Sequence, residues 1–191
     1  MTEGSDFEIA LTEALAELER SAIPHMLIGG LALVAWGLPR ATLDIDFTLW
    51  VTADGMTEVC QRLAARFTAR VPDPWGFVRR TRVLPVIGPA EVRMDFIFAA
   101  FPFEKIMLDR ATSRMLGRVP VKVASLEDLI LLKVGSSRQR DREDVRMIAT
   151  THHSEIDWDY VISVGGMIAD ATEQPEVLSL LQSFRSKGRT Q

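Results

Sequence analysis

The spacing of apolar residues predicts a chain in which helices and short strands follow one another. Apolar residues that recur every three to four positions indicate amphipathic helices, whereas those at every second position indicate strands with one buried face. Helices are expected over about 6–20, 31–36, 56–67, 126–134, 141–149, 158–169 and 175–184, and over part of 102–116. Extended segments are expected over about 25–28, 44–51, 77–84, 91–98 and 119–123. Strands interrupted by helices, and joined in part by a hairpin, indicate an α+β fold with a small mixed sheet, flanking helices and a helical C-terminal portion.

Polar residues that can cap helices mark several of the expected helix starts. Ser5 and Glu8 have the spacing of a capping box ahead of the first helix. Four further residues stand where an N-cap is expected, namely Asp54, Ser125, Asp141 and Asp157. Local chemistry therefore supports the helix boundaries that the periodicity suggests.

Length and composition narrow the choice of protein class. With 191 residues, 47% of them apolar, the chain is expected to form a single domain over 1–191, with its core at about 22–150 and C-terminal helices at about 157–186. A net charge of −4 argues against a broad basic surface that coats nucleic acid. The polar, acidic first residues and the lack of a long uncharged apolar run predict a cytoplasmic protein without a membrane partner.

A glycine pair and two aspartates lie close together near the beginning of the chain. Gly29 and Gly30 follow an apolar strand and open a helix, where backbone N–H groups can approach phosphate oxygens with no Cβ in the way. Asp44 and Asp46 begin the next strand and project from one face of it, with Cα atoms about 6.5 Å apart. Two such carboxylates can grip a divalent ion. An Asp-x-Asp by itself fits an exposed strand end equally well.

A third aspartate occupies the middle of an otherwise apolar strand. Because an unpaired carboxylate is costly to bury, Asp95 is expected to lie near an edge, to pair with an arginine such as Arg79 or Arg93, or to bind a metal ion. Together with Asp44 and Asp46 it gives three carboxylates on two strands. Such a set can hold two Mg²⁺ ions about 3.5–4 Å apart.

These features, in this order, resemble the AbiEii-type nucleotidyltransferases of bacterial abortive-infection and toxin–antitoxin systems, a branch of the DNA-polymerase-β-like nucleotidyltransferase superfamily. The segments that carry the resemblance are Gly29-Gly30, residues 39–46, Asp95, residues 125–129, Lys133 and residues 138–144. The resemblance implies a minimal nucleotidyltransferase fold that binds a nucleoside triphosphate such as ATP with Mg²⁺ and transfers a nucleotide to a hydroxyl. Some toxins of the group act on tRNA, and an antitoxin is then a candidate partner.

The resemblance also implies roles for single residues. Gly29 and Gly30 would hold the triphosphate, and Asp44, Asp46 and Asp95 would be the catalytic residues that hold the metal ions. Asp95 is the candidate to help activate the acceptor hydroxyl. The superfamily's usual glycine-serine is glycine-glycine here, so one hydroxyl contact to phosphate is absent.

Four more residues are expected to contact the nucleotide. Lys133 stands inside an apolar helical run, so its ammonium must either meet an anion or reach solvent along its stem. The family pattern favours a triphosphate contact for Lys133, and a role for Asp144 in orienting the base or the acceptor. Arg40 fits a partner of phosphate or of Asp46, while Thr42 fits either the nucleotide site or a turn.

The leading hypothesis is a Mg²⁺-dependent enzyme that transfers a nucleoside monophosphate to an acceptor hydroxyl, as a toxin-like enzyme acting on tRNA or another macromolecule. One alternative is an antibiotic-modifying enzyme, because lincosamide and aminoglycoside nucleotidyltransferases have a similar glycine pair and Asp-x-Asp. Another is a non-catalytic nucleotide-binding module, against which the presence of all three carboxylates argues. The sequence leaves the base and the acceptor open.

Overall fold

The computed structural model describes residues 5–42 and 44–187; Leu43, within the 39–46 motif, lies outside them. Contacts divide the chain between Ala124 and Ser125 into two compact units, which are described separately. The single domain expected over 1–191 stays a prediction. Within the described residues, no helix is long and apolar enough to cross a membrane.

The first unit is built on a mixed sheet. Its described strands are β1 (His25–Ile28), β2 (Asp44–Leu49), β3 (Thr68–Ala69), β4 (Val83–Ile87), β5 (Arg93–Phe98), β6 (Thr112–Leu116) and β7 (Val119–Val123). They lie side by side in the order β3-β4-β5-β2-β1-β7-β6. The pairs β2–β5 and β1–β7 are parallel and the other pairs are antiparallel. The predicted α+β fold with a mixed sheet is confirmed.

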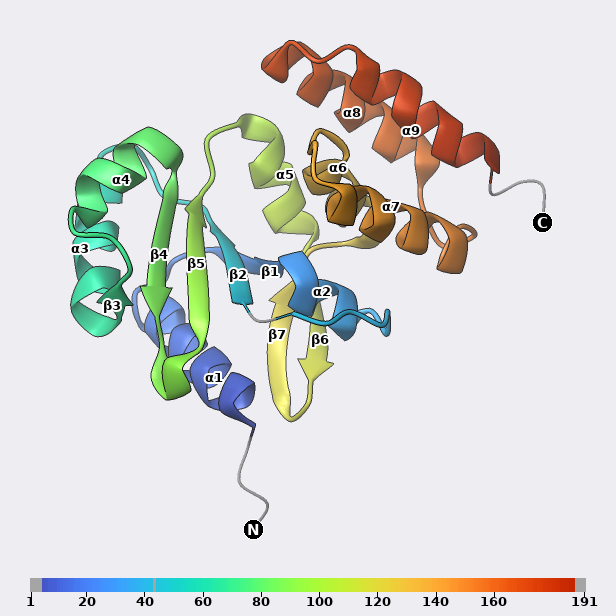
Figure 1. Ribbon diagram of the computed structural model, residues 1–191. Coiled ribbons are helices and arrows are strands. Elements are labelled where there is room, and N and C mark those ends of the chain that lie inside the picture. Colours follow the sequence, from blue (N-terminus) through green and yellow to red (C-terminus); the bar gives the residue numbers. More distant parts are fainter. Residues whose placement is uncertain (1–4, 43, 188–191) are drawn as a thin grey trace. The chain divides into compact units, whose positions relative to one another are not determined.

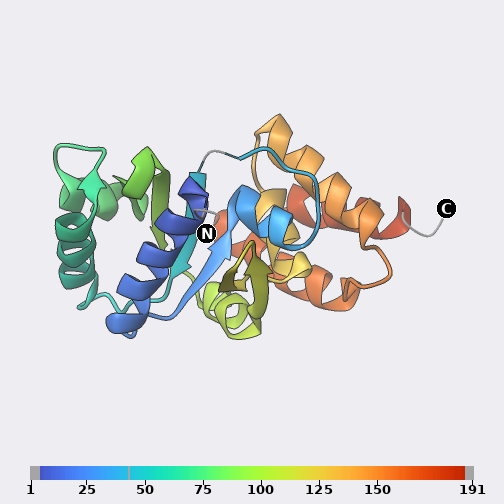
Figure 2. The same ribbon diagram turned by 90° about the horizontal axis from the view of Figure 1, so that it is seen from below.

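Helices of the first unit flank this sheet. They are α1 (Asp6–Arg20), α2 (Gly29–Ala35), α3 (Met56–Arg66), α4 (Pro74–Thr81) and α5 (Pro102–Arg110), with a 3₁₀ turn, η1 (Pro89–Glu91). Figure 1 shows α3 and α4 next to β4, and Figure 2 shows α2 next to the β6–β7 hairpin. The capping box of Ser5 and Glu8 begins α1 as predicted.

Alternation along β2 and β5 decides which side chains enter the core. Ile45 and Phe47 of β2 are fully buried, as are Met94 and Phe96 of β5. The rings of Phe47 and Phe96, which are register partners, stack with centroids 6.1 Å apart. Burial of each such side chain contributes about 1.5–3 kcal/mol. Because successive side chains alternate, the aspartates of both strands share the opposite face.

Two expectations for the first unit are wrong. In the segment 77–84, only Val83 and Leu84 are extended, as the start of β4. Residues 77–81 are helical, because Asp73 accepts a hydrogen bond from the backbone N–H of Gly76 at 2.9 Å and starts α4. The helix ends at Arg82, whose left-handed φ of 62° turns the chain into β4. Asp54 does not cap α3, because the N-cap is Gly55 and makes no side-chain cap hydrogen bond.

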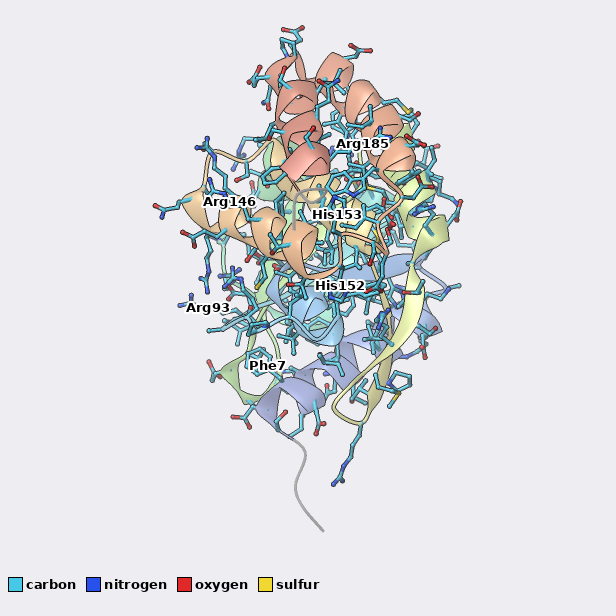
Figure 3. The ribbon with its side chains drawn as sticks, turned by 90° about the vertical axis from the view of Figure 1, so that its right-hand side faces the viewer. Phe7, Arg93, Arg146, His152, His153 and Arg185 are labelled. Carbon is cyan, nitrogen blue, oxygen red and sulfur yellow. The ribbon has the colours of Figure 1, made fainter. Side chains whose placement is uncertain are left out.

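The second unit is helical over its described residues. It comprises α6 (Leu126–Val134), α7 (Gln139–Thr151), α8 (Trp158–Thr172) and α9 (Glu176–Lys187). Ser125 and Asp157 cap α6 and α8 as predicted. Figure 3 labels His153, whose Nε2 lies 3.2 Å from the backbone oxygen of Arg185 and so joins the end of α7 to α9. The predicted helical C-terminal portion is therefore confirmed.

Candidate functional site

Strands β2 and β5 bring the predicted carboxylates together on one face of the sheet. Asp46 and Asp95 are register partners on these parallel neighbours, and Asp44 precedes Asp46 by two residues. Neighbouring strands lie about 4.7–4.9 Å apart, so side chains of register partners stand next to each other. The charge of Asp44 acts on Asp95 and raises its pKa. The fold thus produces the cluster that the spacing alone only suggested.

The glycine pair lies directly against this cluster. Gly29 has a left-handed φ of +70°, and a Cβ at this position would stand 2.0 Å from Oδ2 of Asp46. Gly30 has a comparable neighbour, because its Cβ would lie 2.7 Å from the side chain of Thr42. Gly29 therefore must be glycine for two independent reasons, its backbone conformation and its contact with a carboxylate.

Asp44 carries an unsatisfied oxygen. Its Oδ1 is buried and has no hydrogen-bond partner among the described residues. The hydroxyl of Thr42 donates to the backbone oxygen of Asp44 at 3.2 Å, so it contacts the main chain instead. A buried oxygen without a partner costs about 1–3 kcal/mol, and carboxylate oxygens are the ligands that Mg²⁺ takes. The donor chemistry of this face therefore fits the metal ion implied by the sequence.

Asp95 forms an ion pair with Arg70, and both side chains are half-buried. The expected pairing of Asp95 with an arginine is confirmed, but the arginine is Arg70 rather than Arg79 or Arg93. Arg79 lies in the last turn of α4, and Arg93 is exposed at the start of β5 (Figure 3). Burial raises the pKa of the Asp95 carboxyl; the charge and hydrogen bond of Arg70 oppose this, and the net direction is upward.

As they stand in the structure, the three aspartates are not arranged so that all three can bind one metal ion. Among residues 5–42 and 44–187, no group of three or more His, Cys, Asp or Glu side chains has the geometry to hold a metal ion. The Arg70 guanidinium engages one oxygen of Asp95. Metal binding by Asp44, Asp46 and Asp95 stays a prediction that their shared face and the buried Oδ1 support.

Arg40 is partly exposed, and its Nη1 donates to the backbone oxygen of Ala41 at 2.7 Å. Its expected contact with phosphate stays a prediction, as does the nucleotide role of Thr42. Arg70 was missed because it lies in a short polar segment, 25 residues before Asp95 in sequence, with no periodicity that marks it. Only the pairing of β3 with β4 and of β4 with β5 could have indicated it.

In the second unit, Lys133 is held by two carboxylates of α7. Its Nζ donates to Asp141 Oδ1 at 2.9 Å and to Asp144 Oδ2 at 2.8 Å, with the Lys133 side chain 10% exposed. The ammonium therefore meets anions within its own unit and does not reach solvent along its stem. Its contact with a triphosphate, and the role of Asp144 toward a base or acceptor, stay predictions.

Asp141 does not cap α7, because the N-cap is Arg138. Its carboxylate instead accepts hydrogen bonds from Lys133 and from Arg138 Nε, the latter at 2.7 Å. Burial raises the pKa of Asp141, but hydrogen bonds from Ser136 and Lys133 and two positive charges outweigh burial, so the pKa lies below its ordinary value. This buried network stabilises the packing of α6 on α7.

A buried contact that sequence reasoning missed is made by Asp128. Its Oδ2 accepts from the Ser125 hydroxyl at 2.8 Å, and its Oδ1 accepts from the Tyr160 hydroxyl at 2.8 Å. The second bond joins α6 to α8. Asp128 is fully buried, so these bonds explain an acidic residue on an otherwise apolar helix.

Comparison with known proteins identifies the family. The family described as "Nucleotidyl transferase of unknown function (DUF2204)" matches residues 8–181, which is most of the chain. The protein belongs to this nucleotidyl transferase family. It is thus a nucleotidyltransferase, and the predicted enzyme class is confirmed. No curated protein matches the sequence.

Solved structures support the nucleotidyltransferase fold. The crystal structure of ANT(2")-Ia in complex with adenylyl-2"-tobramycin matches with a TM-score of 0.52 and 18% identity, over 95% of this chain and 98% of that one. The solution structure of the antibiotic-resistance factor ANT(2'')-Ia matches with a TM-score of 0.50 and 14% identity, over 95% and 90%. At these identities the likeness shows the fold alone. The AbiEii-type branch is not tested by it.

Proposed function

We propose that this nucleotidyltransferase transfers a nucleoside monophosphate from a nucleoside triphosphate to an acceptor hydroxyl, with Mg²⁺ bound by Asp44, Asp46 and Asp95. The observation that carries the proposal is the shared face of β2 and β5, where these carboxylates stand against a glycine whose missing Cβ leaves room for one of them. In the reaction the acceptor oxygen forms a bond to the α-phosphorus. The bond from that phosphorus to the bridging oxygen breaks, and pyrophosphate leaves.

Each residue of the cluster has a proposed task. When bound, Mg²⁺ would neutralise the charge on the phosphates and on the leaving group. Asp95 is the candidate to take up the proton of the acceptor hydroxyl. The surface beside Gly29 and Gly30 has no Cβ atoms, so phosphate oxygens can approach the backbone there. Catalysis would then rest mainly on positioning and on charge compensation.

Lys133 and Arg40, which are also predicted to contact the nucleotide, already have hydrogen-bond partners in the structure. Lys133 Nζ already donates to Asp141 and Asp144, so a phosphate would share its ammonium with two carboxylates. Arg40 would exchange the neutral Ala41 carbonyl for a phosphate oxygen, which is a stronger acceptor for a guanidinium. We therefore place Arg40 ahead of Lys133 as a nucleotide contact.

For the acceptor, two classes remain in the proposal. The AbiEii-type resemblance supports a toxin-like cytoplasmic enzyme that acts on tRNA or another macromolecule and has an antitoxin partner. The fold match to ANT(2")-Ia over 95% of the chain supports, about equally, an enzyme that modifies a small antibiotic. Both classes of enzyme need the same chemistry at the aspartates, and they differ in the acceptor molecule that receives the nucleotide.

Label transfer separates these possibilities. The protein would be incubated with Mg²⁺ and each α-labelled nucleoside triphosphate, together with total tRNA or with a panel of aminoglycosides and lincosamides. We expect label in one acceptor class and at least about a 100-fold loss in Asp44→Asn. Asp109→Asn is the matched control, because this aspartate of α5 is exposed and paired with Lys105. If no triphosphate binds with Mg²⁺, and Asp44→Asn changes nothing in a binding assay, the proposal fails.

A further inference from the structure

Arg70 reaches the carboxylate cluster across the sheet. Its backbone N–H donates to the oxygen of Pro85 in β4 at 2.9 Å. Pro85 is the register partner of Asp95, and Asp95 is the register partner of Asp46. Asp46, Asp95 and Pro85 therefore form one row across β2, β5 and β4, neighbouring strands in Figure 1, and Arg70 follows β3 at the end of this row. The backbone bond fixes Arg70 at the end of this row, within reach of Asp95.

The cluster has an excess of negative charge, which Arg70 offsets. Asp44, Asp46 and Asp95 contribute three carboxylates, and the Arg70 guanidinium binds one of them. Arg93, the register partner of Asp44, is exposed. Arg70 and Asp95 are each only 29% exposed, so water screens this pair less than it screens a surface pair. Arg70 binds Oδ1 of Asp95, one of the two oxygens with which this carboxylate could ligate a divalent cation.

We propose that Arg70 is a positioning residue that competes with the divalent cation for Asp95, an inference that rests on the proposed function. The ion pair holds Asp95 in place and keeps the affinity for the cation low when no nucleotide is bound. The triphosphate supplies the anion to which the displaced guanidinium turns. Binding of the cation is thereby coupled to binding of the nucleotide, and Arg70 is the residue that couples them.

A purely structural ion pair would behave differently. It would make removal of Arg70 destabilising and would leave the affinity for a cation unchanged. Competition predicts opposite effects on the two quantities, namely lower stability and tighter cation binding, because the same charge stabilises Asp95 and repels the cation. Measuring both therefore separates the two roles.

The test uses Mn²⁺ as the probe and the full chain without nucleotide. Affinity is measured by isothermal titration calorimetry, and stability by thermal unfolding in the absence of added metal. We expect Arg70→Gln to bind Mn²⁺ about tenfold more tightly, equivalent to about 1.4 kcal/mol, and to unfold at a lower temperature. With Mn²⁺ present, Arg70→Gln should bind a non-hydrolysable triphosphate more weakly. Arg66→Gln is the matched control, because Arg66 forms an ion pair with Glu13, outside the cluster.

Arg70→Lys keeps the charge but not the planar guanidinium, so it should fold and bind Mn²⁺ with an affinity between those of the wild type and Arg70→Gln. If Arg70→Gln and Arg70→Lys both bind Mn²⁺ as the wild type does, the inference is overturned. Equal tightening of Mn²⁺ binding in Arg66→Gln would overturn it as well.

Asp44→Asn distinguishes the two proposals: if it binds Mn²⁺ as tightly as the wild type, the proposed function itself fails. If Asp44→Asn loses Mn²⁺ while the Arg70 variants are unchanged, only the role of Arg70 fails.

Discussion

Gly29→Ala tests whether the contact between the glycine pair and the carboxylates is needed. Two costs add at this position. A non-glycine residue in the left-handed region costs about 1–2 kcal/mol, because its Cβ crowds the following carbonyl. The new Cβ would also stand 2.0 Å from Oδ2 of Asp46, so the carboxylate must move. Overpacking of this kind costs about 1–3 kcal/mol more.

Two other glycines separate these costs. Gly37 has a similar φ of +81° and nothing within 4 Å of its would-be Cβ, so Gly37→Ala measures the backbone cost alone. Gly166 lies inside α8, also with open space, and has no left-handed φ. Gly166→Ala should stabilise the protein by about 0.5–1 kcal/mol, because alanine loses less entropy than glycine in a helix.

The assay is urea unfolding of the three variants, followed by the label-transfer reaction. We expect Gly29→Ala to exceed Gly37→Ala by about 1–3 kcal/mol in lost stability. Gly29→Ala should also lose activity, since Asp46 is displaced, while Gly37→Ala keeps it. If Gly29→Ala is no more destabilising than Gly37→Ala, and is equally active, then the close packing of Asp46 on Gly29 is not a requirement of the site.

Three further predictions concern stability. Lys133→Met removes the cation that Asp141 and Asp144 share, while Arg138 still binds Asp141, and it should cost about 3–5 kcal/mol in urea unfolding; a loss under about 1 kcal/mol would contradict the buried network. Burial lowers the pKa of His25 below its ordinary value of 6.5, so the unfolded chain binds more protons and the wild type loses stability as the pH falls below 6.5. His25→Gln should lack this pH-dependent loss in urea unfolding, and identical pH profiles of the two proteins would disprove it. Asp73→Ala removes the cap of α4 and should cost about 1 kcal/mol, whereas Asp54→Ala, which removes no cap, should be neutral within about 0.5 kcal/mol.

Several elements could be predicted because their signals are local. The capping box of Ser5 and Glu8 and the caps Ser125 and Asp157 act within one turn of helix, so the sequence determined where α1, α6 and α8 begin. Alternation in β5 likewise determined that Asp95 lies opposite the buried Met94 and Phe96. Where two local signals competed, the prediction was wrong. In 77–84 the arginines interspersed among apolar residues resembled a strand, but the cap at Asp73 made 77–81 helical, and the left-handed Arg82 delayed the strand to Val83.

The sequence by itself thus determined the fold class, most of the elements, and the residue types of the candidate site. Only the tertiary structure decided which of these residues meet. Asp46 stands beside Asp95 because β2 and β5 pair in parallel with one particular register. Arg70 binds Asp95 because β4 lies between β3 and β5, and Lys133 binds Asp141 and Asp144 because α6 packs on α7. Register and helix packing arise from contacts between segments far apart in the chain, and periodicity within one segment does not contain them.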